Sequence, residues 1–158
     1  MAKSSLTVAR VMVKLERALA GLAAQRTFEG AIRLRAEALL KHASDMPVAL
    51  LIANNSGRYV DVNDLATRLT GYTRAELLRL AVWDLTPTAS LHAGRRMWSE
   101  FLKVERMAGR YVLLRKDGTE VRADFRAWAN LLPGVHVSAI ATPALVRGPN
   151  ARARRKTR

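Results

Sequence analysis

The chain has 158 residues, a formal net charge of +14, a hydrophobic share of 49% and no cysteine. These values describe one ordinary globular domain with extensions. They exclude a disulfide scaffold, a thiolate zinc site and a cysteine nucleophile. Residues 147–158 carry six basic residues and no acidic one. Nearly half of the excess charge therefore lies in a short terminal tail, which weakens the case for a nucleic-acid-binding core.

The sequence predicts a cytoplasmic chain with no membrane span. No apolar run approaches the ~20 residues that cross a bilayer. The N-terminus lacks the continuous apolar segment of a secretory signal. The absence of cysteine also fits a reducing compartment.

Residues 1–44 are predicted to form amphipathic helices. In residues 5–25, apolar positions recur at alternating spacings of four and three, the pattern of a coiled-coil seam. These seam residues are Val8, Met12, Leu15, Leu19 and Leu22. Three interpretations remain open: a dimerising helix, a helix packed on its own domain, and an Arg-rich organellar transit segment.

From Met46 the pattern becomes that of strands and short helices. Residues 48–53 and 58–62 are predicted strands, joined by the turn residues Asn54 to Gly57. Asn63 or Asp64 caps a short helix over 65–69, and Gly71 closes it. Further helices are predicted after the capping box Thr73-Arg74-Ala75-Glu76 and over residues 91–107.

The last third of the chain is predicted to be β-structure. Strands over 110–114 and 119–129 flank the turn Lys116-Asp117-Gly118, and a third strand covers 135–141. Residues 143–158 show no apolar periodicity and are predicted to be a disordered basic tail. Two strands first and three last suit an α+β fold, with one five-stranded antiparallel sheet and short helices on one face.

Four stretches, in this order, resemble the PAS domain family across residues 45–140. They are Gly57-Arg58-Tyr59-Val60-Asp61-Val62-Asn63, Leu69-Thr70-Gly71-Tyr72-Thr73-Arg74-Ala75-Glu76-Leu77-Leu78, Val82-Trp83-Asp84-Leu85 and Arg115-Lys116-Asp117-Gly118-Thr119. The resemblance implies a PAS domain over residues 45–142. PAS domains sense small molecules, redox state or light, or pair with other domains, and pass signals through flanking helices.

The resemblance also implies partners. Nothing in the chain resembles a kinase, a cyclase or a helix-turn-helix. A sensor of this kind is expected to act through a separate output protein, such as a kinase or regulator, and to form a homodimer through the seam residues.

His92 is a candidate heme ligand, because oxygen-sensing PAS domains carry an iron-ligating His near the start of this helix. Those sensors also present an Arg from the next strand, where this chain has Gly109, with Arg110 beside it. The alternative is an ordinary histidine at a helix start. Cysteine-linked flavin is excluded, and His42 and His136 are interpreted as structural.

Aromatic residues are candidate linings of a ligand cavity between the long helix and the sheet, namely Trp83, Trp98, Phe101 and Trp128. The alternative is that they fill the core. Four arginines are candidates for binding a carboxylate or phosphate, unless they only form a solvated face: Arg95, Arg96, Arg110 and Arg126.

The sequence predicts that this protein is not an enzyme. Its acidic residues are scattered, and it has no Ser/His/Asp arrangement, phosphate-binding Gly-rich loop or HExxH motif. Two functions remain: a sensory PAS domain in signal transduction, and a transcription regulator that uses PAS for dimerisation and the tail for nucleic-acid affinity. The tail residues that would contact nucleic acid or anionic lipid are Arg152, Arg154, Arg155, Lys156 and Arg158.

Overall fold

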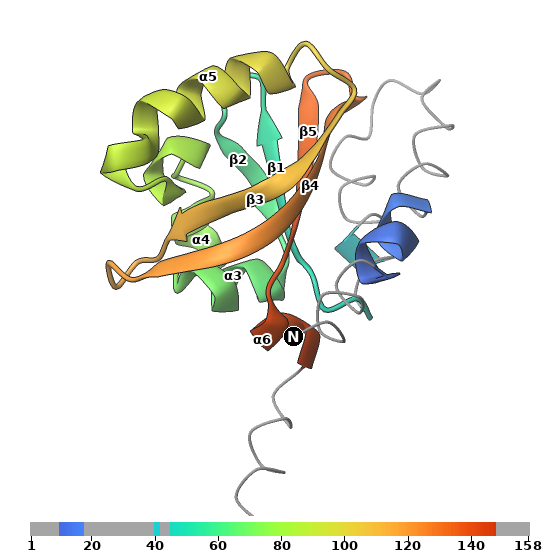
Figure 1. Ribbon diagram of the computed structural model, residues 1–158, viewed down its shortest axis with the longest axis vertical. Coiled ribbons are helices and arrows are strands. Elements are labelled where there is room, and N and C mark those ends of the chain that lie inside the picture. Colours follow the sequence, from blue (N-terminus) through green and yellow to red (C-terminus); the bar gives the residue numbers. More distant parts are fainter. Residues whose placement is uncertain (1–9, 18–39, 42–44, 148–158) are drawn as a thin grey trace, which may run out of the picture.

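The structure is a computed structural model, and it describes residues 10–17, 40–41 and 45–147 (Figure 1). Residues 10–17 are helical. The elements that follow are β1 (Ala49–Asn54), β2 (Tyr59–Val62), α3 (Asp64–Thr70), α4 (Arg74–Leu77), the 3₁₀ helices η1 (Val82–Leu85) and η2 (Thr88–Ser90), α5 (Leu91–Phe101), β3 (Arg106–Leu114), β4 (Glu120–Leu132), β5 (Val135–Ala141) and α6 (Pro143–Arg147).

The five strands form one antiparallel sheet in the order β2-β1-β5-β4-β3. The first and last strands are therefore neighbours, with Ala49 opposite Ile140 and Asn54 opposite Val135. Helices α3, α4 and α5 lie over one face, as Figure 1 shows. The predicted α+β fold, with a five-stranded antiparallel sheet, is confirmed.

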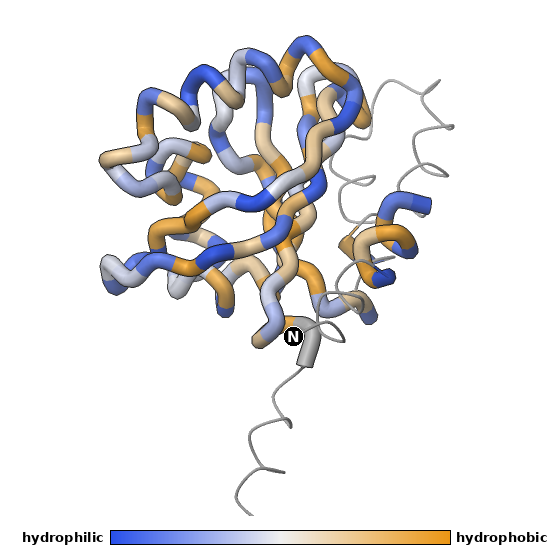
Figure 2. The backbone as a smooth tube through the Cα atoms, viewed as in Figure 1, coloured by the Kyte–Doolittle hydropathy of each residue, from blue (hydrophilic) through white to orange (hydrophobic). Residues whose placement is uncertain are grey.

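Each face of the sheet is covered by its own hydrophobic cluster. The inner face, toward α5, includes Leu51, Phe125 and Ile140. The outer face includes Leu50 and Trp128. Because side chains alternate along a strand, each central strand supplies both clusters, and Figure 2 shows hydrophobic residues concentrated along the strands.

The helical segment of residues 10–17 packs against the outer face. Its side chains Met12 and Leu15 are 3% and 0% exposed and belong to the outer cluster. Glu16 binds Arg106 at 2.8 Å and Arg126 at 3.5 Å, so two ion pairs flank the apolar contact. Two of the five seam residues are thus buried against their own domain.

Asn63 joins the first strand to the first helix of the domain. Its side-chain oxygen accepts hydrogen bonds from the Ala66 and Leu50 backbone N–H groups, both at 3.0 Å. Its amide donates to the Val48 carbonyl at 3.0 Å. Asn63, one of the two residues predicted for this role, thereby caps α3 and anchors it to the start of β1.

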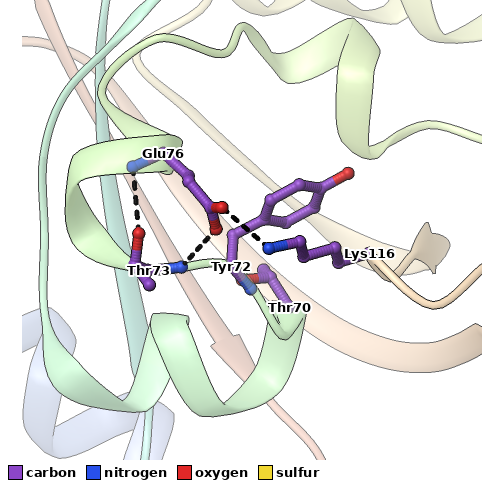
Figure 3. A network of polar contacts seen from close by, with 5 residues as sticks. All are labelled: Thr70, Tyr72, Thr73, Glu76 and Lys116. Atoms are coloured by element: carbon purple, nitrogen blue, oxygen red, sulfur yellow. Dashed lines mark hydrogen bonds and ion pairs between the residues drawn. The ribbon is translucent and has the colours of Figure 1, made fainter.

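A polar network ties α4 to the β3–β4 hairpin (Figure 3). Thr73 and Glu76 form the predicted capping box, and the Glu76 carboxylate also accepts from Lys116 Nζ at 2.7 Å. The Lys116 backbone N–H donates to the Thr70 carbonyl at 2.9 Å. Two of the stretches that carry the family resemblance are therefore joined to each other in space.

Several boundaries differ from the sequence prediction, and β4, for example, extends to Leu132 instead of ending at 129. The helix predicted over 91–107 ends at Phe101, and β3 begins at Arg106 because Arg106 and Met107 pair with Trp128 and Ala127 of β4. Residues 143–147 form α6, so the predicted tail is helical in its first five residues. Residues 148–158 lie outside the described part of the chain.

Candidate functional site

A pocket of about 100 Å³ lies between α5, η1 and the inner face of the sheet. All five strands contribute to its walls, among them Leu51 of β1, Phe125 of β4 and Ile140 of β5. Helix α5 contributes Gly94, Met97, Trp98 and Phe101, which share one side of the helix at spacings of three and four. The walls are mostly apolar, as in small-molecule sites generally.

Gly57 sets the position of Trp83 at one end of the pocket. Gly57 has a φ of +76°, and a Cβ placed on it would lie 2.8 Å from the Trp83 ring. Its carbonyl accepts a hydrogen bond from the Val82 N–H at 2.9 Å. The absence of a side chain on the β1–β2 turn therefore lets η1 and its tryptophan pack against the turn.

Four aromatic rings form a continuous cluster beside the pocket. Trp98 contacts Trp83 edge to face at 5.9 Å, and it contacts Phe101 at 5.4 Å and His136 at 5.5 Å between ring centroids. Arg95, which is exposed, places its guanidinium 4.8 Å from the centroid of Trp83, a cation–π contact. The cluster links α5 to η1 and β5.

His136 is 1% exposed, and both of its ring nitrogens are hydrogen-bonded. Nδ1 accepts from the Asn130 backbone N–H at 3.0 Å, so the proton of the neutral ring lies on Nε2, 2.8 Å from Asn55 Oδ1. Burial lowers the pKa of His136 from its ordinary value. Its interpretation as a structural residue is consistent with these contacts.

Asn130 is the bulged residue of β4 that supplies this bond. It has a φ of +50°, the left-handed region, and it lies where the pairing of β4 with β5 shifts between Trp128 and Leu132. Asparagine adopts this conformation more readily than most residues. The bulge thereby turns a backbone N–H of β4 toward His136.

Three of the four aromatic residues predicted to line a cavity do so: Trp83, Trp98 and Phe101. Trp128 does not line the pocket between α5 and the sheet, and this part of the prediction is corrected; it lines a separate pocket with Glu16 and Arg106. It lies on the outer face in the cluster with Met12 and Leu15, because its position on β4 has the opposite parity to Phe125 and Ala127, which line the pocket.

The pocket also contains polar side chains that were not predicted from the sequence. Tyr59 of β2, Tyr111 of β3 and Ser138 of β5 line it. Burial raises the pKa of both tyrosines well above the ordinary value, so both phenols are uncharged near neutral pH. Period-two alternation marks the inward positions of each strand, but only the order of the strands brings these three together.

His92 lies in the first turn of α5 and is exposed, and it is not among the residues that line the pocket. The pocket contains no histidine, and at about 100 Å³ it is smaller than sites for drug-sized ligands, which start at ~300 Å³. Its residues do not fit heme held through His92. Heme ligation by this residue stays a prediction that the pocket does not support.

The other candidate residues do not converge on one site. Arg95 contacts Trp83, Arg110 binds Asp124 at 3.0 Å and Arg126 contacts Glu16. In the described residues, no group of three or more His, Asp or Glu side chains is arranged to hold a metal ion. No helix of the described part is long and apolar enough to cross a membrane.

Several predicted contacts fall outside the described residues. The seam residues Val8, Leu19 and Leu22 are among them, and so are the tail residues Arg152, Arg154, Arg155, Lys156 and Arg158. Dimerisation and nucleic-acid or lipid contact by these residues stay predictions.

The fold and the pocket can be compared with known proteins. A search of curated proteins finds no match. Among solved structures, a domain of a sensory box sensor histidine kinase/response regulator from Geobacter sulfurreducens matches with a TM-score of 0.57 and 20% identity, covering 72% of this chain and all of that one.

Two further structures were determined with ligands. The PAS domain of the Cronobacter turicensis RpfR quorum-sensing receptor, in complex with BDSF, matches with a TM-score of 0.53 and 17% identity over 61% of this chain and 94% of its own. The PAS domain of a LuxR-family transcriptional regulator from Burkholderia thailandensis, in complex with ethanol, matches with a TM-score of 0.53 and 18% identity. The match covers 64% of this chain and 94% of that one.

A sequence model of the PAS domain matches residues 47–141, which include all five strands and the whole pocket. This agrees with the residues that carried the resemblance and with the solved structures of the same fold. The chain belongs to the PAS domain family.

Proposed function

We propose that this chain is a sensory domain that binds a small molecule in the pocket between α5 and the sheet. The observation that carries the proposal is a pocket bounded by all five strands whose walls contain no charged side chain. A buried apolar cavity with a few polar groups is the usual form of a small-molecule site. The fold is that of sensor domains of kinases and of ligand-binding regulators.

The same strands connect the pocket to the outer face. On β4, Ala127 lines the pocket, whereas its neighbours Arg126 and Trp128 contact the segment of residues 10–17. On β3, Met107 lines the pocket and its neighbour Arg106 binds Glu16. A shift of either strand caused by a ligand therefore reaches the N-terminal segment directly.

The proposed sensor gives its output through a change in how residues 10–17 pack on the outer face of the sheet. A ligand that favours one position of β3 and β4 biases that docking by its differential affinity for the two states. The released or repositioned segment then contacts a second chain, either another copy or an output protein. Met12 and Leu15 are the residues whose exposure would change.

Filling the pocket with a side chain imitates an occupied state. Ala127→Ile places a β-branched side chain, favoured in strands, into the cavity. Ala89→Ile is the matched control, because it adds the same atoms at an exposed position of η2. Amide hydrogen exchange of residues 11–17 in the full chain is the measurement, with β1 and β5 amides as a record of global stability.

We expect exchange at residues 11–17 to change about tenfold in Ala127→Ile after correction for global stability, and to stay unchanged in Ala89→Ile. Equal exchange in the wild type and both variants would overturn the coupling between pocket and segment.

A further inference from the structure

Three hydroxyl groups on the pocket wall have no protein partner. The side chains of Tyr59, Tyr111 and Ser138 line the pocket, and none of the three hydroxyls hydrogen-bonds to another residue in the described part of the chain. Thr86 differs, since its hydroxyl donates to the Val82 carbonyl at 2.9 Å. In the described part of the chain, Arg115 Nε is the only fully enclosed side-chain polar atom without a partner, so the three hydroxyl oxygens are open to the pocket and available to a ligand.

The three hydroxyls come from separate strands of the sheet. Tyr59 lies on β2, Tyr111 on β3 and Ser138 on β5, and the rest of the wall is largely apolar. Each phenol is a hydrogen-bond donor in its neutral form, and the serine hydroxyl both donates and accepts. A guest with an oxygen atom can satisfy groups that the protein leaves unpaired.

The charge and volume of the pocket limit what that guest can be. No Asp, Glu, Lys, Arg or His lines the pocket, so an ionised guest would lose its hydration with no countercharge. The volume of about 100 Å³ is below the ~150 Å³ of an engineered cavity that binds benzene. The guest is therefore compact, with few atoms beyond a five-membered ring. Met97 lines the pocket and is 41% exposed, and a methionine side chain adapts readily to a slightly larger ligand.

We infer that the pocket selects a compact, uncharged molecule with one oxygen acceptor, such as a small ketone, aldehyde or alcohol, held by the hydroxyls of Tyr59, Tyr111 and Ser138. This inference rests on the proposed function and specifies its ligand class. The apolar part of the ligand contacts the leucine, isoleucine and aromatic side chains of the pocket, and its oxygen accepts hydrogen bonds from the hydroxyls.

Three ring compounds of similar size separate the contributions. Cyclopentanone has the acceptor, cyclopentane lacks it, and cyclopentanecarboxylate carries a charge. Titration of the full chain is followed by the methyl resonances of its methionines. Met97 and Met107 line the pocket, so their methyl signals report binding there. Met12 and Met46 pack on the outer face, so shifts of their signals report effects of the compound away from the pocket.

We expect cyclopentanone to shift the Met97 and Met107 methyl signals and to bind about tenfold more tightly than cyclopentane, the worth of one neutral hydrogen bond. Cyclopentanecarboxylate should not bind. Tyr111→Phe and Ser138→Ala should each weaken cyclopentanone three- to tenfold and leave cyclopentane unchanged. Tyr72→Phe, outside the pocket, is the matched control.

The outcomes distinguish the two proposals. If cyclopentane binds as well as cyclopentanone, or if the carboxylate binds best, the ligand class is wrong and the pocket remains a ligand site. If none of the three compounds shifts the Met97 and Met107 signals, the pocket does not take small molecules and the proposed function itself fails. Because the removed hydroxyls have no protein partner, both variants should fold with wild-type stability.

Discussion

The buried imidazole of His136 makes the stability of this domain depend on pH near neutrality. Its Nδ1 accepts the Asn130 N–H, so a second proton on the ring would place two donors against each other. Its hydrogen-bond partners Asn55 and Asn130 are uncharged, and its ring neighbours Trp98 and Phe101 are aromatic. Nothing among these contacts compensates a positive charge.

The direction of the effect follows from the lowered pKa. In the unfolded chain the ring titrates near 6.5, whereas in the folded protein burial lowers its pKa. As the pH falls below 6.5, the unfolded chain binds a proton that the native state does not bind. The stabilisation is therefore present above that pH and is lost as the pH falls toward the folded pKa.

The size of the loss follows from linkage. Between about pH 7.5 and about pH 5.5, proton binding by one such group in the unfolded chain lowers the free energy of unfolding by at most ~1.4 kcal/mol. For a chain of this length, this maximum corresponds to a melting temperature lower by about 3–6 °C.

Urea unfolding at three pH values across this window measures the effect. His136→Gln removes the titration, and its profile should be flat, at an overall cost of about 1–3 kcal/mol because the Asn130 N–H loses its acceptor. His92→Gln, at an exposed position of α5, is the control that should keep the slope. An equal slope in the wild type and His136→Gln would refute the reasoning, as would a folded His136 ring titrating at or above 6.5.

Three further substitutions test the packing by urea unfolding. Leu15→Ala should lower the free energy of unfolding by about 2–5 kcal/mol, whereas Val13→Ala, at a position 41% exposed, should lower it by less than ~0.5 kcal/mol. Equally small effects of both substitutions would mean that residues 10–17 do not pack against the sheet. Gly57→Ala should cost more than ~1 kcal/mol and change Trp83 fluorescence, because its Cβ meets that ring; an unaltered spectrum would contradict the contact. Asn63→Ala should cost about 2 kcal/mol or more through three lost hydrogen bonds, and a neutral result would contradict its anchoring role.

Features fixed by neighbouring residues were predictable from sequence. The capping box of Thr73 and Glu76 and the left-handed Gly71 depend only on residues within a few positions, and both are present. The same locality made the four stretches of family resemblance recognisable. Their contacts explain why such stretches are informative, since Glu76 and Lys116 belong to different stretches and bind each other.

Features fixed by pairing between distant strands were not predictable. Met107 suits the apolar side of a helix, and it became a strand residue because Ala127 lies opposite it on β4. Trp128 was expected in the pocket, but a shift of one position on a strand exchanges the two faces of a sheet. Tyr59, Tyr111 and Ser138 line one pocket because β2, β3 and β5 belong to one sheet, with β5 between β1 and β4.

The central position of β1 and β5 has a consequence for how the protein is made. Residues 49–54 pair with residues 135–141, so the middle of the sheet cannot form until almost the whole domain has been synthesised. Folding must close a long loop before this pairing stabilises the chain, which slows it. During that time β1 presents the apolar run Ala49–Ile52 with one edge unpaired, and such edges favour aggregation. A fragment that ends before Val135 would keep this edge unpaired, and we expect it to aggregate more readily than the full chain.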